Sequence, residues 1–154
     1  MRITRTLTLD APVDRIVTAL LSEELAAKRM DALKVSDYQH KIDGNVAVTQ
    51  ASVPAEKLPS KVRSFAKNGV NATVTAKASG NVVDYKLDAH GLPVSLTWSI
   101  TLQEGTPTVG EIVGELKVKI PIVGARVEKA AEGRVDRLLA KEGESIAEVI
   151  AAQE

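Results

Sequence analysis

Polar and apolar residues alternate along most of the chain, which is the pattern of β-strands with one buried and one exposed face. The alternation begins over residues 3–9 and returns over 35–42 and 46–53, with a hairpin turn signal, Asp-Gly-Asn, at 43–45. Four more alternating stretches follow, separated by short segments rich in glycine, proline or asparagine. Their apolar positions, which we expect to face inward, are Val70, Ala72, Val74, Ala76, Ala78, Val83, Tyr85, Leu87, Val94, Leu96, Trp98, Ile100, Leu102, Ile112, Gly114, Leu116, Val118 and Ile120.

Helical signals occur between the early strands. Asp10 and Pro12 are typical of a helix start, and residues 16–21 continue with helical spacing. Ser22 begins a second short helix, and Pro59 opens a third. The apolar residues expected on the second and third helices are Leu25, Ala26, Met30 and Leu33, and Leu58, Val62 and Phe65.

The last third of the chain predicts a long strand, a hinge of sequence Pro-Ile-Val-Gly at 121–124, and a long C-terminal helix. Pro121 cannot donate a ladder hydrogen bond and suits a strand end, while Gly124 lets the first helical turn lie close to the sheet. Gly143, followed by Ser-Ile-Ala-Glu at 145–148, is similar to a restarted capping box, so we expect a kink or break there. The apolar stripe of this helix is expected to contain Val123, Val127, Ala130, Ala131, Leu138, Ile146 and Val149.

These elements predict an α+β fold in which a curved antiparallel sheet of about seven strands wraps around the C-terminal helix. Two short helices follow the first strand, and residues 1–154 form one domain. A fold of this kind often leaves a cavity between helix and sheet. Alanine and glycine are frequent on both expected walls of that cavity, so the layers either close up or leave space for a ligand.

Composition narrows the function classes. The 154 residues carry 20 basic and 20 acidic side chains, and a dedicated nucleic-acid-binding domain would usually be clearly basic. The absence of cysteine excludes disulfides, thiolate catalysis and cysteine-based zinc sites, and it is compatible with a reducing cytosol. We expect a cytoplasmic protein, since neither a signal peptide nor a run of 18 apolar residues is visible.

Three segments carry a resemblance to a known family. They are Leu-Thr-Leu-Asp-Ala-Pro-Val-Asp at 7–14, Leu-Pro-Ser-Lys-Val at 58–62 and Val-Lys-Ile-Pro-Ile-Val-Gly-Ala-Arg-Val-Glu at 118–128. With the element order, they make the chain similar to the START-like helix-grip superfamily, and closest to an uncharacterised bacterial branch. The resemblance covers essentially the whole chain. It implies a helix-grip fold with an apolar cavity and offers no catalytic motif to transfer.

The expected ligand site lies in that cavity. Its candidate lining residues are Trp98, Leu96, Ile100, Tyr85, Tyr38, Phe65, Val127 and Ala131. The aromatic members could offer an indole N–H or a hydroxyl group to a ligand, although filling the core is the more common role of such residues. We expect no catalytic residue, no metal and no cofactor, because His40 and His90 lack metal-type spacing to other ligands.

The basic third helix invites a separate interpretation. Lys61, Arg63 and Lys67 share this segment with Val62 and Phe65. It could form a lid at the cavity mouth that makes transient contact with anionic lipid, or simply a small surface helix that covers the sheet.

Three functions remain open from the sequence. The first is a binding protein or carrier for a small hydrophobic molecule. The second is an enzyme of the cyclase or hydratase type, which would need polar groups converging inside the cavity; two buried titratable groups near Trp98 would favour it. The third is a protein-interaction module in which the cavity is only core, and a large exposed apolar patch or a stable dimer would favour that function. The oligomeric state is not predicted.

Overall fold

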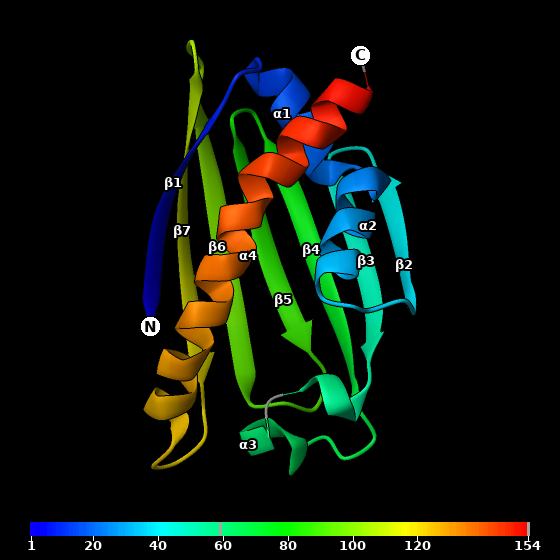
Figure 1. The fold of residues 1–154 in the computed structure, drawn as a ribbon, viewed down its shortest axis with the longest axis vertical. Coiled ribbons are helices and arrows are strands. Elements are labelled where there is room, and N and C mark those ends of the chain that lie inside the picture. Colours follow the sequence, from blue (N-terminus) through cyan, green and yellow to red (C-terminus); the bar gives the residue numbers. More distant parts are fainter. Residues whose placement is uncertain (59, 154) are drawn as a thin grey trace.

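The computed structural model describes residues 1–58 and 60–153, without the side chain of Lys61 (Figure 1). In this part of the chain, seven strands form one antiparallel sheet in the order β1-β7-β6-β5-β4-β3-β2. The strands are β1 (Arg2–Leu9), β2 (Tyr38–Asp43), β3 (Val46–Val53), β4 (Val70–Ser79), β5 (Val82–Ala89), β6 (Val94–Gln103) and β7 (Thr108–Val118). The helices are α1 (Val13–Leu21), α2 (Glu23–Ala32), the short η1 (Ala55–Lys57), α3 (Ser60–Arg63) and α4 (Gly124–Ala152).

The helices α1, α2 and α4 cover one side of the sheet, which we call the inner face (Figure 1). Helix α4 crosses this face obliquely. Its N-terminal part lies along β7 and β1, and its C-terminal part packs against α1 and α2. The predicted helix-grip architecture is confirmed, and every predicted strand is present; the second starts at Tyr38 rather than Val35.

The hydrophobic core is concentrated where the C-terminal part of α4 meets α1 and the sheet. Its fully buried members include Ile16 of α1, Ile100 of β6, and Ile146 and Val149 of α4. This dense end holds the helices against the sheet, because each of these side chains loses nearly all contact with water. The opposite end of the inner face is less completely covered.

Helix α4 differs from the prediction in two ways. It runs without interruption from Gly124 to Ala152, so the predicted break at Gly143 is wrong. Ala130 and Leu138, predicted on its apolar stripe, are exposed; the residues toward the sheet continue instead through Val135, Leu139, Glu142 and Ile146. The error arose from treating Ala130 and Ala131 as equivalent, although one residue rotates a helix by about 100°.

The start of α1 also differs from the prediction. Asp10 does not cap this helix, which begins at Val13. The Val13 amide instead donates a hydrogen bond of 2.9 Å to the carboxylate of Glu104, in the β6–β7 connection. Ser22 caps α2 as predicted, since its hydroxyl oxygen accepts a hydrogen bond from the Leu25 amide.

The hinge before α4 is very tight. A Cβ atom on Gly124 would lie 2.5 Å from the carbonyl oxygen of Val118, so only glycine fits without moving the backbone. This confirms the predicted close approach of the helix start to the sheet. The third helix is shorter than predicted and spans Ser60–Arg63, while Pro59 and the Lys61 side chain lie outside the described part.

Candidate functional site

Two stacked aromatic rings form the centre of the inner face. Tyr85 of β5 and Trp98 of β6 are directly paired across the strands, and their ring centroids lie 4.7 Å apart with an interplanar angle of 3°. Trp98 fits beside β7 because its neighbour there is Gly114: a Cβ atom at that position would lie 3.0 Å from the Cβ of Trp98. The stack is therefore a rigid wall set by sheet register.

An ion pair between two helices lies against this stack. Arg29 of α2 donates hydrogen bonds from Nε (3.0 Å) and Nη2 to the same carboxylate oxygen of Glu142 in α4. Arg29 also donates to the hydroxyl oxygen of Tyr85 at 3.2 Å, and its guanidinium lies 5.2 Å from the centroid of that ring. The side chains of Arg29 and Glu142 are only 24% and 14% exposed. Three polar groups thus converge beside the aromatic stack.

The surroundings hold two of these groups in their protonated forms. Burial raises the pKa of Tyr85 above its ordinary value of 10, although the nearby Arg29 guanidinium opposes this effect. Burial acts to lower the pKa of Arg29, but the charges of Tyr85 and Glu142 outweigh it, so the pKa of Arg29 is raised. At neutral pH the site presents a neutral phenol and a guanidinium ion.

Beyond the stack, the inner face remains apolar and partly open. Val74, Leu87 and Leu96 occupy one row across β4, β5 and β6, and all three side chains are only half-buried although they point inward. Leu87 is two residues from the end of β5 and Leu96 two residues from the start of β6, while Val74 also packs against the core. Apolar side chains that face the helices and still meet solvent are the expected floor of a ligand site.

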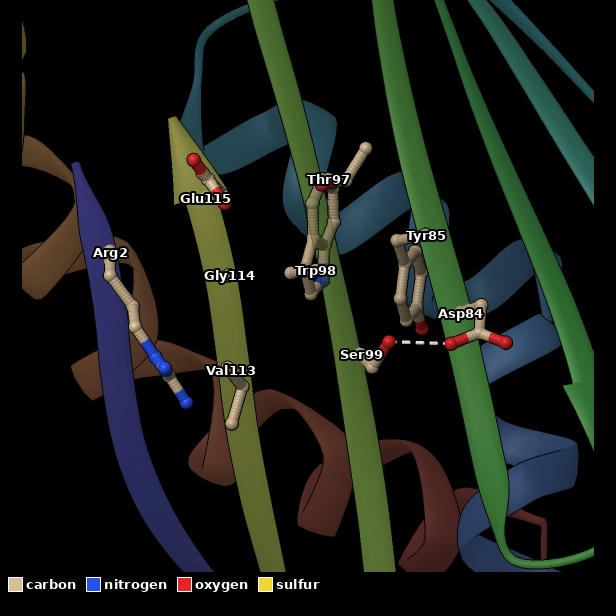
Figure 2. A pocket seen from close by; sticks show the side chains of 9 residues that line it. All are labelled: Arg2, Asp84, Tyr85, Thr97, Trp98, Ser99, Val113, Gly114 and Glu115. Atoms are coloured by element: carbon tan, nitrogen blue, oxygen red, sulfur yellow. Dashed lines mark hydrogen bonds between the residues drawn. The ribbon is translucent and has the colours of Figure 1, made fainter. Parts of the chain in front are cut away.

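A depression also lies on the outer face of the sheet, and Tyr85 and Trp98 are among the residues that line it (Figure 2). It has a volume of about 420 Å³ and includes the exposed side chains of Arg2, Asp84 and Glu115. Figure 2 shows it from the outer side, with the helices behind the sheet and the hydrogen bond from Ser99 to Asp84 across its floor. This open, polar-rimmed depression lies on the opposite side from the predicted cavity and does not test it.

The eight predicted lining residues fall into three groups. Trp98, Leu96, Ile100 and Tyr85 are inner-face neighbours on β5 and β6, and Ile100 is part of the fully buried core. On α4, Val127 is buried and Ala131 half-buried. Tyr38 on edge strand β2 is four strand positions from Trp98, and Phe65 is 50% exposed beyond α3. The structure thus brings together the residues of β5 and β6 and leaves Tyr38 and Phe65 apart from them.

Sequence reasoning missed Arg29 and Glu142. Each occupies the buried stripe of its helix: Arg29 follows Leu25 by four residues, and Glu142 precedes Ile146 by four. A charged residue on an otherwise apolar helical stripe was therefore the available signal. Opposite charges on two such stripes indicate a buried pair.

The histidines have structural surroundings. His40 bridges β2 to the end of α1, since its Nε2 donates to the carbonyl oxygen of Leu21 at 2.9 Å and its Nδ1 lies 2.8 Å from the Thr49 hydroxyl. His90 is exposed near Asp88. No cluster of three or more metal-binding side chains occurs in the described part of the chain. None of the helices described there combines the length and apolar composition needed to cross a bilayer.

Comparison with known proteins agrees with this architecture. Residues 4–150 match the family described as "Protein of unknown function (DUF2505)". A comparison with curated protein sequences gives no match. Among solved structures, a protein from Thermus thermophilus is similar with a TM-score of 0.69 and 11% identity, covering 100% of this chain and 99% of that one.

Two further structures place the fold. A START superfamily protein from Mycobacterium smegmatis has a TM-score of 0.61 at 13% identity, with 99% of both chains covered. A point mutant of norcoclaurine synthase from Thalictrum flavum, in complex with a transition state analogue, has a TM-score of 0.63 at 18% identity, covering 99% of this chain and 95% of that one. Identities this low show the fold alone. The chain therefore belongs to DUF2505, a family of unknown function, and has the helix-grip fold of the START superfamily.

Proposed function

We propose that this protein binds a small hydrophobic molecule between the inner face of the sheet and α4. The observation that carries the proposal is the half-buried row Val74, Leu87 and Leu96, which faces the helices but remains in contact with solvent. Filling this space with an apolar ligand would remove three large side chains from water, and the hydrophobic effect favours such burial.

The polar groups beside the row define which ligand chemistry fits. The hydroxyl of Tyr85 is held as a donor, and one carboxylate oxygen of Glu142 receives both hydrogen bonds from Arg29. Among the described residues, both of these hydrogen bonds end on the same oxygen of Glu142, so its second oxygen can accept a hydrogen bond from a ligand. A mostly apolar molecule with a single hydroxyl or amide group would match this combination of an apolar floor and few polar partners.

An enzyme is the second candidate, because titratable groups do converge next to Trp98. Norcoclaurine synthase shows that a protein of this fold can be an enzyme. Proton transfer near neutral pH, however, requires a group whose pKa lies near the working pH. The pKa values of both Tyr85 and Arg29 are raised, so both keep their protons, and the arrangement favours binding of a polar group over acid–base catalysis.

The proposal can be tested with the neutral probe 1-N-phenylnaphthylamine. Trp98 is the only tryptophan, so all energy transfer from tryptophan to the bound probe starts at the aromatic stack, and the position of the probe is then tested with variants on α4. We expect saturable transfer in the wild-type protein. The variant Ala131→Phe should reduce it strongly, because Ala131 is half-buried on α4, four residues after the buried Val127, and a phenyl ring there adds bulk on the side of the helix that faces the sheet.

Ala130→Phe is the matched control. Ala130 is exposed one residue earlier on the same helix, so its replacement adds the same bulk toward solvent. Unchanged transfer in a folded Ala131→Phe variant would place the probe elsewhere, and equal loss in both variants would show that the loss does not come from the side of α4 that faces the sheet. No saturable transfer in the wild-type protein would contradict the proposed function.

A further inference from the structure

Two segments that are far apart in sequence meet solvent at one end of the molecule. The segment 55–69, which contains η1 and α3, and the β7–α4 connection both lie at the end opposite the dense core (Figure 1). The half-buried row of the inner face is near the β5–β6 connection at this same end (Figure 1), because Leu87 is two residues from the end of β5 and Leu96 two residues from the start of β6. The described parts of these two segments, which lie at the same end of the molecule (Figure 1), are together called the basic end.

Each segment of the basic end exposes a large apolar side chain. Phe65 is 50% exposed, and Ile122 is 99% exposed. Ile122 also has a positive φ of 73°, and the Val123 amide donates to the Pro121 carbonyl oxygen at 2.8 Å, which makes it the apex of a γ-turn. This conformation is strained for a β-branched residue. The chain thus holds an isoleucine fully in water at a tip where glycine would fit better.

Positive charge is concentrated around these two apolar tips. Residues 55–69 contain four basic side chains and one acidic side chain, and residues 119–126 contain two basic side chains and no acidic one, which gives a net charge of +5. The whole chain is neutral, so the remainder carries −5. Arg63, Lys67, Lys119 and Arg126 are all exposed.

We propose that the basic end docks reversibly on an anionic lipid surface. In this arrangement Ile122 and Phe65 enter the interfacial layer while the surrounding lysines and arginines face the lipid head groups. Apolar insertion and electrostatic attraction are each weak alone, and stable membrane association usually needs two such signals. Isolated protruding tips with cations around them fit a fluid lipid surface better than the shaped pocket of a protein partner. The proposal rests on this surface alone and does not require a ligand.

The experiment is flotation of the full chain with vesicles. Phosphatidylcholine vesicles are compared with vesicles that contain phosphatidylcholine and phosphatidylglycerol, at low and high salt. We expect binding only to the anionic vesicles, and weaker binding at high salt. Ile122→Gly should lower the partition coefficient by about tenfold or more, because the apolar tip is lost. Arg126→Glu should lower it by about thirtyfold, because two units of charge are changed.

Control variants separate docking from folding. Ile42→Ser removes another exposed apolar side chain, on β2, and Lys86→Glu reverses an exposed charge on the outer face of β5; both should bind vesicles like the wild-type protein. Ile122→Gly should not lower Tm, since glycine relieves the strained φ. Retained probe binding in Ile122→Gly would confirm that the ligand site is intact. Absence of wild-type binding to anionic vesicles, or binding that neither Ile122→Gly nor Arg126→Glu weakens, would overturn the proposal.

Discussion

The pair between Arg29 and Glu142 allows the most quantitative prediction. Replacing Glu142 by Leu removes the carboxylate partner of Arg29 and leaves its guanidinium next to an apolar helix face, with the Tyr85 hydroxyl as the remaining acceptor among the described residues. The double variant Arg29→Met/Glu142→Leu removes both charges and leaves apolar groups of similar size. Because an uncompensated buried charge is costly, the single variant should be much less stable than the double variant.

The magnitude follows from burial. Removal of one partner from a fully buried pair costs about 3–5 kcal/mol. The exposed fractions of 24% and 14% admit some water, so we expect a loss of about 2–3 kcal/mol for Glu142→Leu, or about 4–12 °C in Tm for a domain of this size. The double variant should lie within about 1 kcal/mol of the wild-type protein.

Urea unfolding of the wild-type protein, Arg29→Met, Glu142→Leu and the double variant measures the coupling energy between the two side chains, with far-UV circular dichroism as the signal. The neighbouring pair between Lys28 and Glu148 is the matched control. It joins the same two helices but is 40% and 53% exposed, so its coupling energy should be below about 1 kcal/mol. A coupling energy for Arg29 and Glu142 no larger than that of the control pair would refute the reasoning.

Two further predictions concern other parts of the structure. Gly124→Ala should destabilise the protein by about 1–3 kcal/mol, because the new Cβ would lie 2.5 Å from the Val118 carbonyl oxygen. Gly133→Ala, in open space on the same helix, should instead stabilise the protein by about 0.5–1 kcal/mol. Thermal unfolding of the two variants measures whether Tm falls in the first and rises in the second. The raised pKa of Tyr85 stabilises the folded state fully below the ordinary pKa of 10, and this stabilisation is lost as the pH rises above it. The free energy of unfolding in urea should therefore fall less steeply between about pH 9.5 and 11 in Tyr85→Phe than in the wild-type protein. An identical slope in both proteins would contradict a raised pKa of Tyr85.

Much of the fold could be predicted because strand alternation is a local signal. The inward positions on β6 and β7, such as Trp98 and Ile112, follow directly from a period of two, and antiparallel neighbours in a meander need only short turns. Pro121 and Gly124, followed by apolar residues at helical spacing, likewise predicted the hinge and the long helix from local signals, and the resemblance over 118–128 agreed with them. The unbroken helix at Gly143 was missed because packing of Ile146 and Val149 into the core outweighs the intrinsic helix preference of one glycine.

The candidate site was less predictable because it depends on contacts between distant segments. The stack of Tyr85 on Trp98 requires one particular register of β5 and β6, which alternation alone does not determine. Arg29 and Glu142 are 113 residues apart, and only the oblique path of α4 brings them together. Tyr38 was grouped with Trp98 as an aromatic residue of the same interior, but the sequence contains no information about their distance across the sheet.

The most direct test of the account is native mass spectrometry of freshly purified protein, followed by denaturation and organic extraction. The proposed function predicts a discrete extra mass of a small apolar molecule that disappears on denaturation. The same mass should be retained by Ala130→Phe and lost from Ala131→Phe. A protein that carries no such mass, and that also fails to bind the neutral probe, would contradict ligand binding between the sheet and α4.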